Sequence, residues 1–124
     1  MSRVVLVGLG GLLGSVARYE LAGYVQRLNG SLFPLGTLAV NVLGSFVLGL
    51  VVALSLERGL INAEARLFLG VGVCGGFTTM STFSYETIAL LRDGNTAAAL
   101  GNVGATLVIC LLAVWLGDTV ARAL

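Results

Sequence analysis

Residues 75–84 read GGFTTMSTFS, a double glycine followed by a cluster of hydroxyl side chains inside the third apolar segment of the chain. Glycine relaxes a helical backbone, and Thr78, Thr79 or Ser81 can cap the amides of a helix that restarts. The stretch therefore predicts a helix that is broken between Gly75 and Thr79. Because hydrocarbon cannot satisfy the freed backbone groups, the break must be buried in protein or line an ion pathway. The alternative is a glycine kink used only for packing.

The composition around this stretch predicts an all-α membrane protein. The 124 residues are 57% hydrophobic and 10% charged, with a mean hydropathy of +1.01, whereas globular proteins are about a quarter charged. A bilayer core about 30 Å thick needs roughly 20 apolar residues per helix. The length thus supplies four spans and leaves no room for a soluble domain, which predicts a multi-pass protein of the inner (plasma) membrane.

The four spans are expected to form one transmembrane domain over residues 1–124. Their predicted ranges are about 4–25, 35–56, 66–91 and 96–120. The linkers are short and carry turn residues such as Gly30, Gly59 and Gly94. An up-and-down order of four helices puts both termini on one side of the membrane.

The seven arginines specify the orientation weakly. One side collects Arg3, Arg58, Arg66 and Arg122, and the other collects Arg27 and Arg92, with Arg18 as a possible third. So small a bias permits insertion in both directions and hence an antiparallel homodimer, although a single orientation is the alternative. The net charge of +1 comes with no basic run that would attract nucleic acid, so we do not expect a nucleic-acid partner.

The chain contains no set of residues for catalysis or zinc binding. It has no histidine, and Cys74 and Cys110 both lie in apolar stretches. Neither a nucleophile with its base nor a zinc cluster can be assembled from these residues. We therefore do not expect an enzyme.

Two spans carry one polar stripe each, at a spacing of four residues. The stripes are Thr37, Asn41 and Ser45 in the second span, and Asn102, Thr106 and Cys110 in the fourth. A buried amide without partners costs about 2 to 7 kcal/mol, so Asn41 must find hydrogen bonds. The bonds either join helices, at about 0.6 to 2 kcal/mol each, or belong to a polar track. Eighteen glycines, some at small-xxx-small spacing such as Gly10 and Gly14, predict close helix packing.

Arg18 and Glu86 are charged residues within the predicted spans. Because a charge at a helix centre costs about 2.5 to 3.5 kcal/mol on insertion scales, each is expected to face the bundle interior or a vestibule. Arg18 can instead reach the interface beside Tyr19, with Glu20 neutralising it. Glu86 can bond Thr82, shape a pore mouth or reach the interface.

Three ordered motifs resemble those of one known family. They are GGLLGSVARY at 10–19, GTLAVNVLGSF at 36–46 and GGFTTMSTFS at 75–84. Together they resemble the signatures of the Fluc/CrcB fluoride channels. The resemblance implies a passive, fluoride-selective channel with fluoride, sodium and the lipid bilayer as its partners. It also implies a dual-topology antiparallel homodimer with two pores and a central structural Na⁺ at the dimer interface.

The family resemblance also implies roles for individual residues. The backbone carbonyls of Gly75 and Thr78 would bind sodium, and Asn41 would be a donor in the pore. Other implied pore residues are Ser81, Thr82, Ser84, Asn102, Thr106 and Cys110. Fluoride is small and strongly hydrated, so a narrow pore must replace its water with such donors.

The family's pair of phenylalanines falls at positions 80 and 83, where the electropositive ring edges can face an anion. Phe83 is present, but position 80 holds Met80. A thioether keeps the bulk and lacks a ring edge. The alternative interpretation is that Met80 and Phe83 are ordinary packing residues at helical spacing.

Two other functions compete. A small multidrug-resistance type transporter, which exchanges protons for cations, is also short and dual in topology, but it needs a deeply buried carboxylate in the first helix. Here Glu20 lies late in that helix, beside Arg18. A non-transporting scaffold subunit explains the glycines, but it does not explain the polar stripes beside the break.

Overall fold

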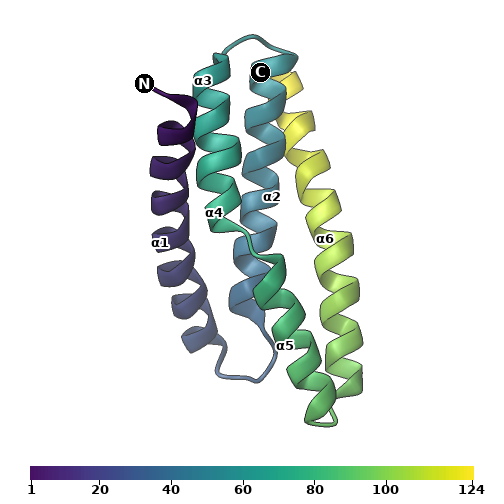
Figure 1. Cartoon of the computed structure of the whole chain (residues 1–124). Coiled ribbons are helices and arrows are strands. Elements are labelled where there is room, and N and C mark those ends of the chain that lie inside the picture. Colours follow the sequence, from purple (N-terminus) through teal and green to yellow (C-terminus); the bar gives the residue numbers. More distant parts are fainter.

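The computed structural model describes residues 1–124 and contains only helices. The elements are α1 (Arg3–Asn29), α2 (Leu35–Leu56), α3 (Ala63–Arg66), the π-helical η1 (Leu67–Cys74), α4 (Gly75–Phe77), α5 (Met80–Arg92) and α6 (Thr96–Ala123). They form four stretches long and apolar enough to cross a membrane, the third being 63–92. The stretches run up and down, and both termini lie at the same end (Figure 1). The prediction of an all-helical protein with four spans is confirmed.

Local signals determine where the first helix begins and ends. The Ser2 hydroxyl accepts a hydrogen bond from the Val5 amide at 3.2 Å and caps the start of α1. Gly30 has a φ of 63° and a left-handed conformation, which ends α1 after Asn29. The helix therefore continues beyond the expected end at Val25.

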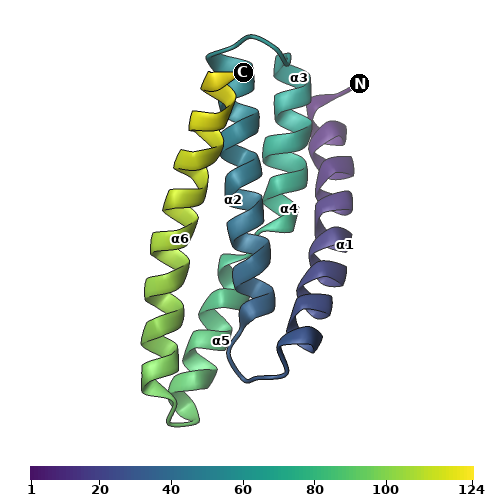
Figure 2. The ribbon, with the colours of Figure 1, turned by 180° about the vertical axis from the view of Figure 1, so that it is seen from behind.

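Glycines bring the helix backbones into contact. A Cβ built on Gly14 would lie 2.1 Å from the carbonyl oxygen of Val73, and one on Gly117 would lie 2.1 Å from that of Phe46. The first contact joins α1 to the third span and the second joins α6 to α2. Seen from behind, α2 lies between α1 and α6 (Figure 2). The predicted close packing through Gly10 and Gly14 is confirmed, because both glycines touch backbone atoms of the third span.

The third span is interrupted at Thr78 and Thr79. Their φ and ψ angles are −89° and 157°, and −151° and 112°, which are extended conformations. Gly75 stays helical, at −61° and −40°. The interruption thus falls on β-branched residues, which favour extended backbone. Gly76 is required for close packing against α1, because a Cβ there would lie 2.5 Å from the carbonyl oxygen of Gly11.

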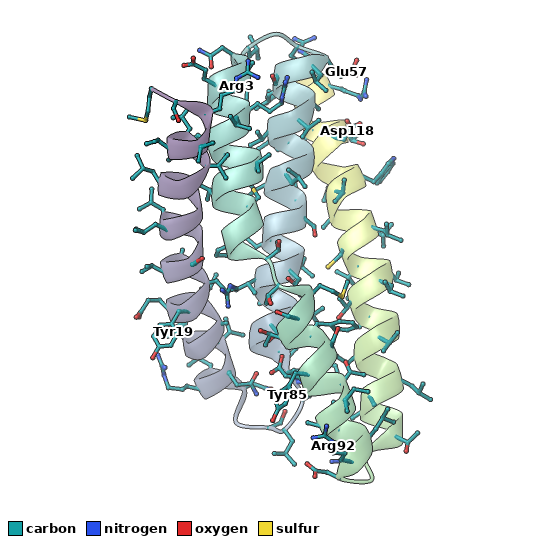
Figure 3. All side chains as sticks on the ribbon, in the orientation of Figure 1. Arg3, Tyr19, Glu57, Tyr85, Arg92 and Asp118 are labelled. Atoms are coloured by element: carbon teal, nitrogen blue, oxygen red, sulfur yellow. The ribbon has the colours of Figure 1, made fainter.

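Most apolar side chains point outward, and only 23 of the 124 residues are buried. Figure 3 shows Arg3, Glu57 and Asp118 toward one end of the bundle and Tyr19, Tyr85 and Arg92 toward the other. Charged side chains at both ends, with tyrosines at one of them, flank an apolar middle, which is the pattern of a bilayer-spanning bundle. Polar residues buried between the helices are therefore exceptional and locate the candidate site.

Candidate functional site

Asn41 of α2 bonds directly to the interruption of the third span. Its side-chain Nδ2 donates to the carbonyl oxygen of Thr79 at 3.1 Å, and its Oδ1 accepts from the Thr79 amide at 2.7 Å. One amide side chain thus satisfies both backbone groups of an extended residue inside the bundle. The Asn41 residue is 7% exposed, so these bonds are made largely away from solvent.

Thr79 also begins the second half of the span. Its hydroxyl oxygen accepts from the Thr82 amide at 3.2 Å, which makes Thr79 the N-cap of α5. The Thr79 hydroxyl further bonds those of Thr82 at 3.1 Å and Ser81 at 3.2 Å. The Ser84 hydroxyl donates to the Met80 carbonyl at 2.8 Å. Among the three predicted candidates for the cap, the structure selects Thr79.

A cavity of 370 Å³, here called the central cavity, lies beside the interruption. Its polar or sulfur-containing lining includes Asn41, Ser45, Thr78, Thr79, Met80, Thr106 and Cys110. These residues come from α2, the third span and α6. The structure therefore brings together residues of both predicted polar stripes with the residues of the break.

A second cavity of 280 Å³, here called the side cavity, lies between α1, α2 and the third span. Its polar lining includes Arg18, Thr37, Thr79 and Glu86. Thr79 lines both cavities, so the interruption is the point at which they approach each other. Both predicted vestibule residues, Arg18 and Glu86, thus face the same cavity.

The partners of these two charges differ from those considered from sequence. Glu86 accepts a hydrogen bond from the Thr37 hydroxyl, not from Thr82. Arg18 has no carboxylate within 4.0 Å, so Glu20 does not neutralise it. Instead its Nε donates to the Gly76 carbonyl oxygen at 3.0 Å. The bond of Arg18 depends on the contact between α1 and the third span, and the bond of Glu86 depends on the contact between α2 and α5. Residue spacing along a single helix does not reveal either bond.

Asn102 lies outside both cavities. It is 2% exposed, donates to the Thr87 hydroxyl at 2.9 Å and accepts from the Thr106 hydroxyl at 3.5 Å. The Thr87 hydroxyl in turn donates to the Phe83 carbonyl at 2.8 Å. Thr87 was not among the predicted site residues. Its position one turn after Phe83, on the same helical face, is the signal that could have found it.

Met80 and Phe83 have different surroundings although three residues separate them. Phe83 is 8% exposed, whereas Met80 is 65% exposed and lines the central cavity. Only Met80 is therefore available to a ligand in that cavity or to a second molecule on this face.

Comparison with known proteins identifies the family. The model of the family described as "CrcB-like protein, Camphor Resistance (CrcB)" matches residues 5–118. The chain belongs to the CrcB family. It is 50% identical to a fluoride-specific ion channel FluC of Opitutus terrae over 123 residues, 98% of this chain and 93% of the relative. Identity to the FluC of Geobacter sulfurreducens is 48% over the full length of both, and to that of Thermus thermophilus 52% over 100% of this chain and 97% of the relative.

In this CrcB chain the four spans make a multi-pass protein of the plasma membrane. The carbonyl groups at the break are the candidate cation ligands. The hydrogen bonds that bridge the break use the carbonyls of Cys74, Gly76 and Thr79, and none of them uses that of Gly75 or Thr78. The carbonyl oxygens of Gly75 and Thr78, like that of Phe77, therefore accept no hydrogen bond across the break, and they are ligands of the kind that a hard cation takes.

Proposed function

We propose that this CrcB chain is a fluoride-selective channel through which fluoride leaves the cell passively, down its gradient. The proposal rests on the names of its full-length relatives, which are fluoride-specific ion channels, and on the four membrane spans. A channel forms no covalent bond with its ion, so the function is transport and not enzymatic catalysis. No observation favours the proton-coupled transporter, since Glu20 is exposed.

The observation that carries the proposal is the junction at Thr79, where two cavities with polar residues in their linings approach each other at a break held by Asn41. A carboxamide has two N–H groups, and Asn41 uses one of them on the Thr79 carbonyl. The second can therefore serve an anion. A donor with its other bonds already made is held in place before the ion arrives, and it can replace part of the ion's water shell without reorganising.

Some of the remaining residues of the proposed pore line the central cavity, and others support those that do. Thr106 and Cys110 line the central cavity with Asn41 and continue the path along α6. Asn102, buried behind them, holds α6 to α5 through Thr87. Ser81, Thr82 and Ser84 supply hydroxyls near the break, and Met80 supplies apolar wall in the central cavity, while Phe83 packs in the core beside it.

The proposed channel is an antiparallel, dual-topology homodimer with two pores. Support comes from surface that the single chain leaves open. A Cβ on Gly75 would have no atom within 4 Å, so nothing in the chain requires glycine there, although a helical glycine costs about 1 kcal/mol relative to alanine. Met80, which lines the central cavity with Gly75, is 65% exposed on α5. A second copy approaching this face would account for these features, and the weak arginine bias permits its opposite orientation.

A central sodium ion is part of the proposal. The free carbonyls of Gly75 and Thr78 from each of two copies would supply four oxygen ligands. When bound, the cation would offset the charge of fluoride ions nearby. The open space at Gly75 leaves the second copy room to contribute its ligands.

Fluoride efflux from liposomes tests the channel function. Vesicles containing purified protein are loaded with fluoride or chloride, and release is followed with ion-selective electrodes. We expect rapid fluoride release, no chloride release and no dependence on a pH gradient. Asn41→Asp replaces the donor facing Thr79 with a carboxylate oxygen, and we expect at least about a hundredfold loss, as for a buried unpaired charge. Wild-type protein that is folded yet releases no fluoride would contradict the proposal.

The dimer and the sodium ion need separate measurements. In sealed vesicles, a protease site on a C-terminal tag should be cut in about half of the chains if both orientations insert equally. Replacing sodium by N-methylglucamine throughout purification should lower the melting temperature of the wild type. Uniform protection or uniform cleavage of the tag would contradict dual topology, and an unchanged melting temperature would contradict the sodium site.

A further inference from the structure

Arg18 makes a contact that a vestibule residue does not need. Its Nε donates at 3.0 Å to the carbonyl of Gly76, a residue 58 positions later in the chain. The backbones of α1 and the third span touch at Gly14, which lies one turn before Arg18, and at Gly76, which is the residue that Arg18 bonds. The two glycines therefore bring the guanidinium to the level of the break.

The Gly76 carbonyl is one that the break leaves without its helical partner. In an uninterrupted helix it would accept from the amide of Met80, but the extended Thr78 and Thr79 move that amide away. An unsatisfied carbonyl in the membrane interior costs several kcal/mol. A cation at the C-terminal end of a helix also agrees with the direction of the helix dipole, and a charged donor makes a stronger bond than a neutral one.

The charge on Arg18 is not engaged by an acid. No carboxylate lies within 4.0 Å, and Glu86, which lines the same side cavity, is bonded by Thr37. The backbone carbonyl is the only hydrogen-bond partner of Arg18 within the chain. Within the chain, Arg18 therefore binds the backbone at the break and forms no ion pair.

We infer that Arg18 is a positioning residue that caps the first half of the broken third span. Its bond to the Gly76 carbonyl fixes the backbone there, and so fixes the direction of the nearby carbonyls of Gly75 and Thr78. Arg18 thus holds the first side of the break, and Asn41 holds the second side at Thr79. The inference rests on the proposed function only where it concerns the ion; the cap itself is a property of the folded chain.

Hydrogen–deuterium exchange of the purified full-length protein tests the cap without relying on transport. We compare wild type with Arg18→Met, which removes the charge and the donor, and Arg18→Lys, which keeps both on a different stem. Arg27→Gln, at the end of α1 and away from the break, is the matched control. Peptides covering the break report the local effect, and peptides from α6 report global stability.

We expect exchange at the break to rise at least about tenfold in Arg18→Met, since a charge-assisted bond is lost. Arg18→Lys should give a smaller rise, and α6 and Arg27→Gln should stay at the wild-type level. If Arg18→Met does not fold, Arg18→Gln replaces it with the same expectation. Unchanged exchange at the break in the folded variant would overturn the inference.

Fluoride efflux from the same preparations separates this inference from the proposed function. If efflux is lost most in Arg18→Met and less in Arg18→Lys, as expected for the rise in exchange, the result supports Arg18 as a residue that positions the break. Efflux that falls in Arg18→Met with no change in exchange would mean that Arg18 acts only through its charge, which overturns the cap. Absence of efflux from wild type, with exchange still rising in the variant, would contradict the channel function and leave the cap supported.

Discussion

The two halves of the third span are held in the bundle by different means. The first half, from α3 to α4, packs backbone against backbone on α1: Cβ atoms on Gly14 or Gly76 would lie 2.1 and 2.5 Å from carbonyl oxygens across the contact. The second half, α5, is joined to α2 and α6 through side chains, with bonds from Thr37 to Glu86 and from Asn102 to Thr87.

The first half of the span therefore fixes where the break lies, and the second half provides the polar groups near it. Backbone contact tolerates no added atom and fixes the position of one end of the break. The side-chain hydrogen bonds leave polar groups of α2 and α5 facing the cavities, and Met80 of α5 stays exposed beside the central cavity. A rigid half beside a polar half is what a preorganised binding site requires. The three predictions below test each half, in order of decreasing effect.

The largest effect is expected from Gly14→Ala. The new methyl group would overlap the Val73 carbonyl oxygen, so α1 must move away from η1, and the free energy of unfolding should fall by about 3 kcal/mol. Reversible unfolding by SDS in mixed micelles measures it. Gly8→Ala adds the same group on the same helix where no atom lies within 4 Å, and it should leave stability unchanged or slightly raised. Equal losses in the two variants would mean that the backbone contact does not limit packing.

A smaller effect is expected from Asn102→Asp, which tests the bonds of the second half. A carboxylate at this buried position should lower the free energy of unfolding by about 2.5 kcal/mol near neutral pH. Asn102→Leu has a similar volume and leaves Thr87 bonded to the Phe83 carbonyl, so it should cost less than about 1.5 kcal/mol. The same unfolding assay compares them. A leucine variant as unstable as the aspartate variant would show that the Asn102 bonds themselves are essential.

The smallest effect is expected from Thr79→Val, which keeps the branched shape and removes the hydroxyl that caps α5. The loss should be about 1 kcal/mol, as for other N-caps. Ser84→Ala, which removes an exposed hydroxyl bonded within its own helix, should change stability by less than about 0.5 kcal/mol. Helicity by circular dichroism and the unfolding midpoint measure both. Equal effects would argue against Thr79 as the cap.

Much of the architecture was predictable because it depends on short-range rules. Apolar stretches of sufficient length predicted four spans, and turn residues such as Gly30 and Gly94 predicted their ends. Small residues at a spacing of four predicted that Gly10 and Gly14 face another helix. The ordered motifs predicted the CrcB family, which the family match confirms.

The pairings between helices were less predictable. From sequence, Glu86 had Thr82 as a candidate partner one turn away, but its partner is Thr37 on α2. Arg18 had Glu20 nearby, but it bonds the Gly76 carbonyl. Thr87 was overlooked because its spacing of one turn from Phe83 marks it only as a neighbour on that helical face, and its bond to Asn102 of α6 depends on packing. In each case the chosen partner is distant in the chain and close in space.

The sequence by itself determined that the chain is a four-span helical membrane protein, and it pointed to a polar, glycine-rich stretch of the third span as its unusual region. Those properties follow from hydrophobicity and residue type, which act over a few neighbouring positions. Only the tertiary structure decided that the interruption falls on Thr78 and Thr79, that Asn41 holds it, and that two cavities approach each other there. The physical reason is that each buried backbone group takes the donor or acceptor that packing brings within 3 Å or so, and packing depends on all four spans together.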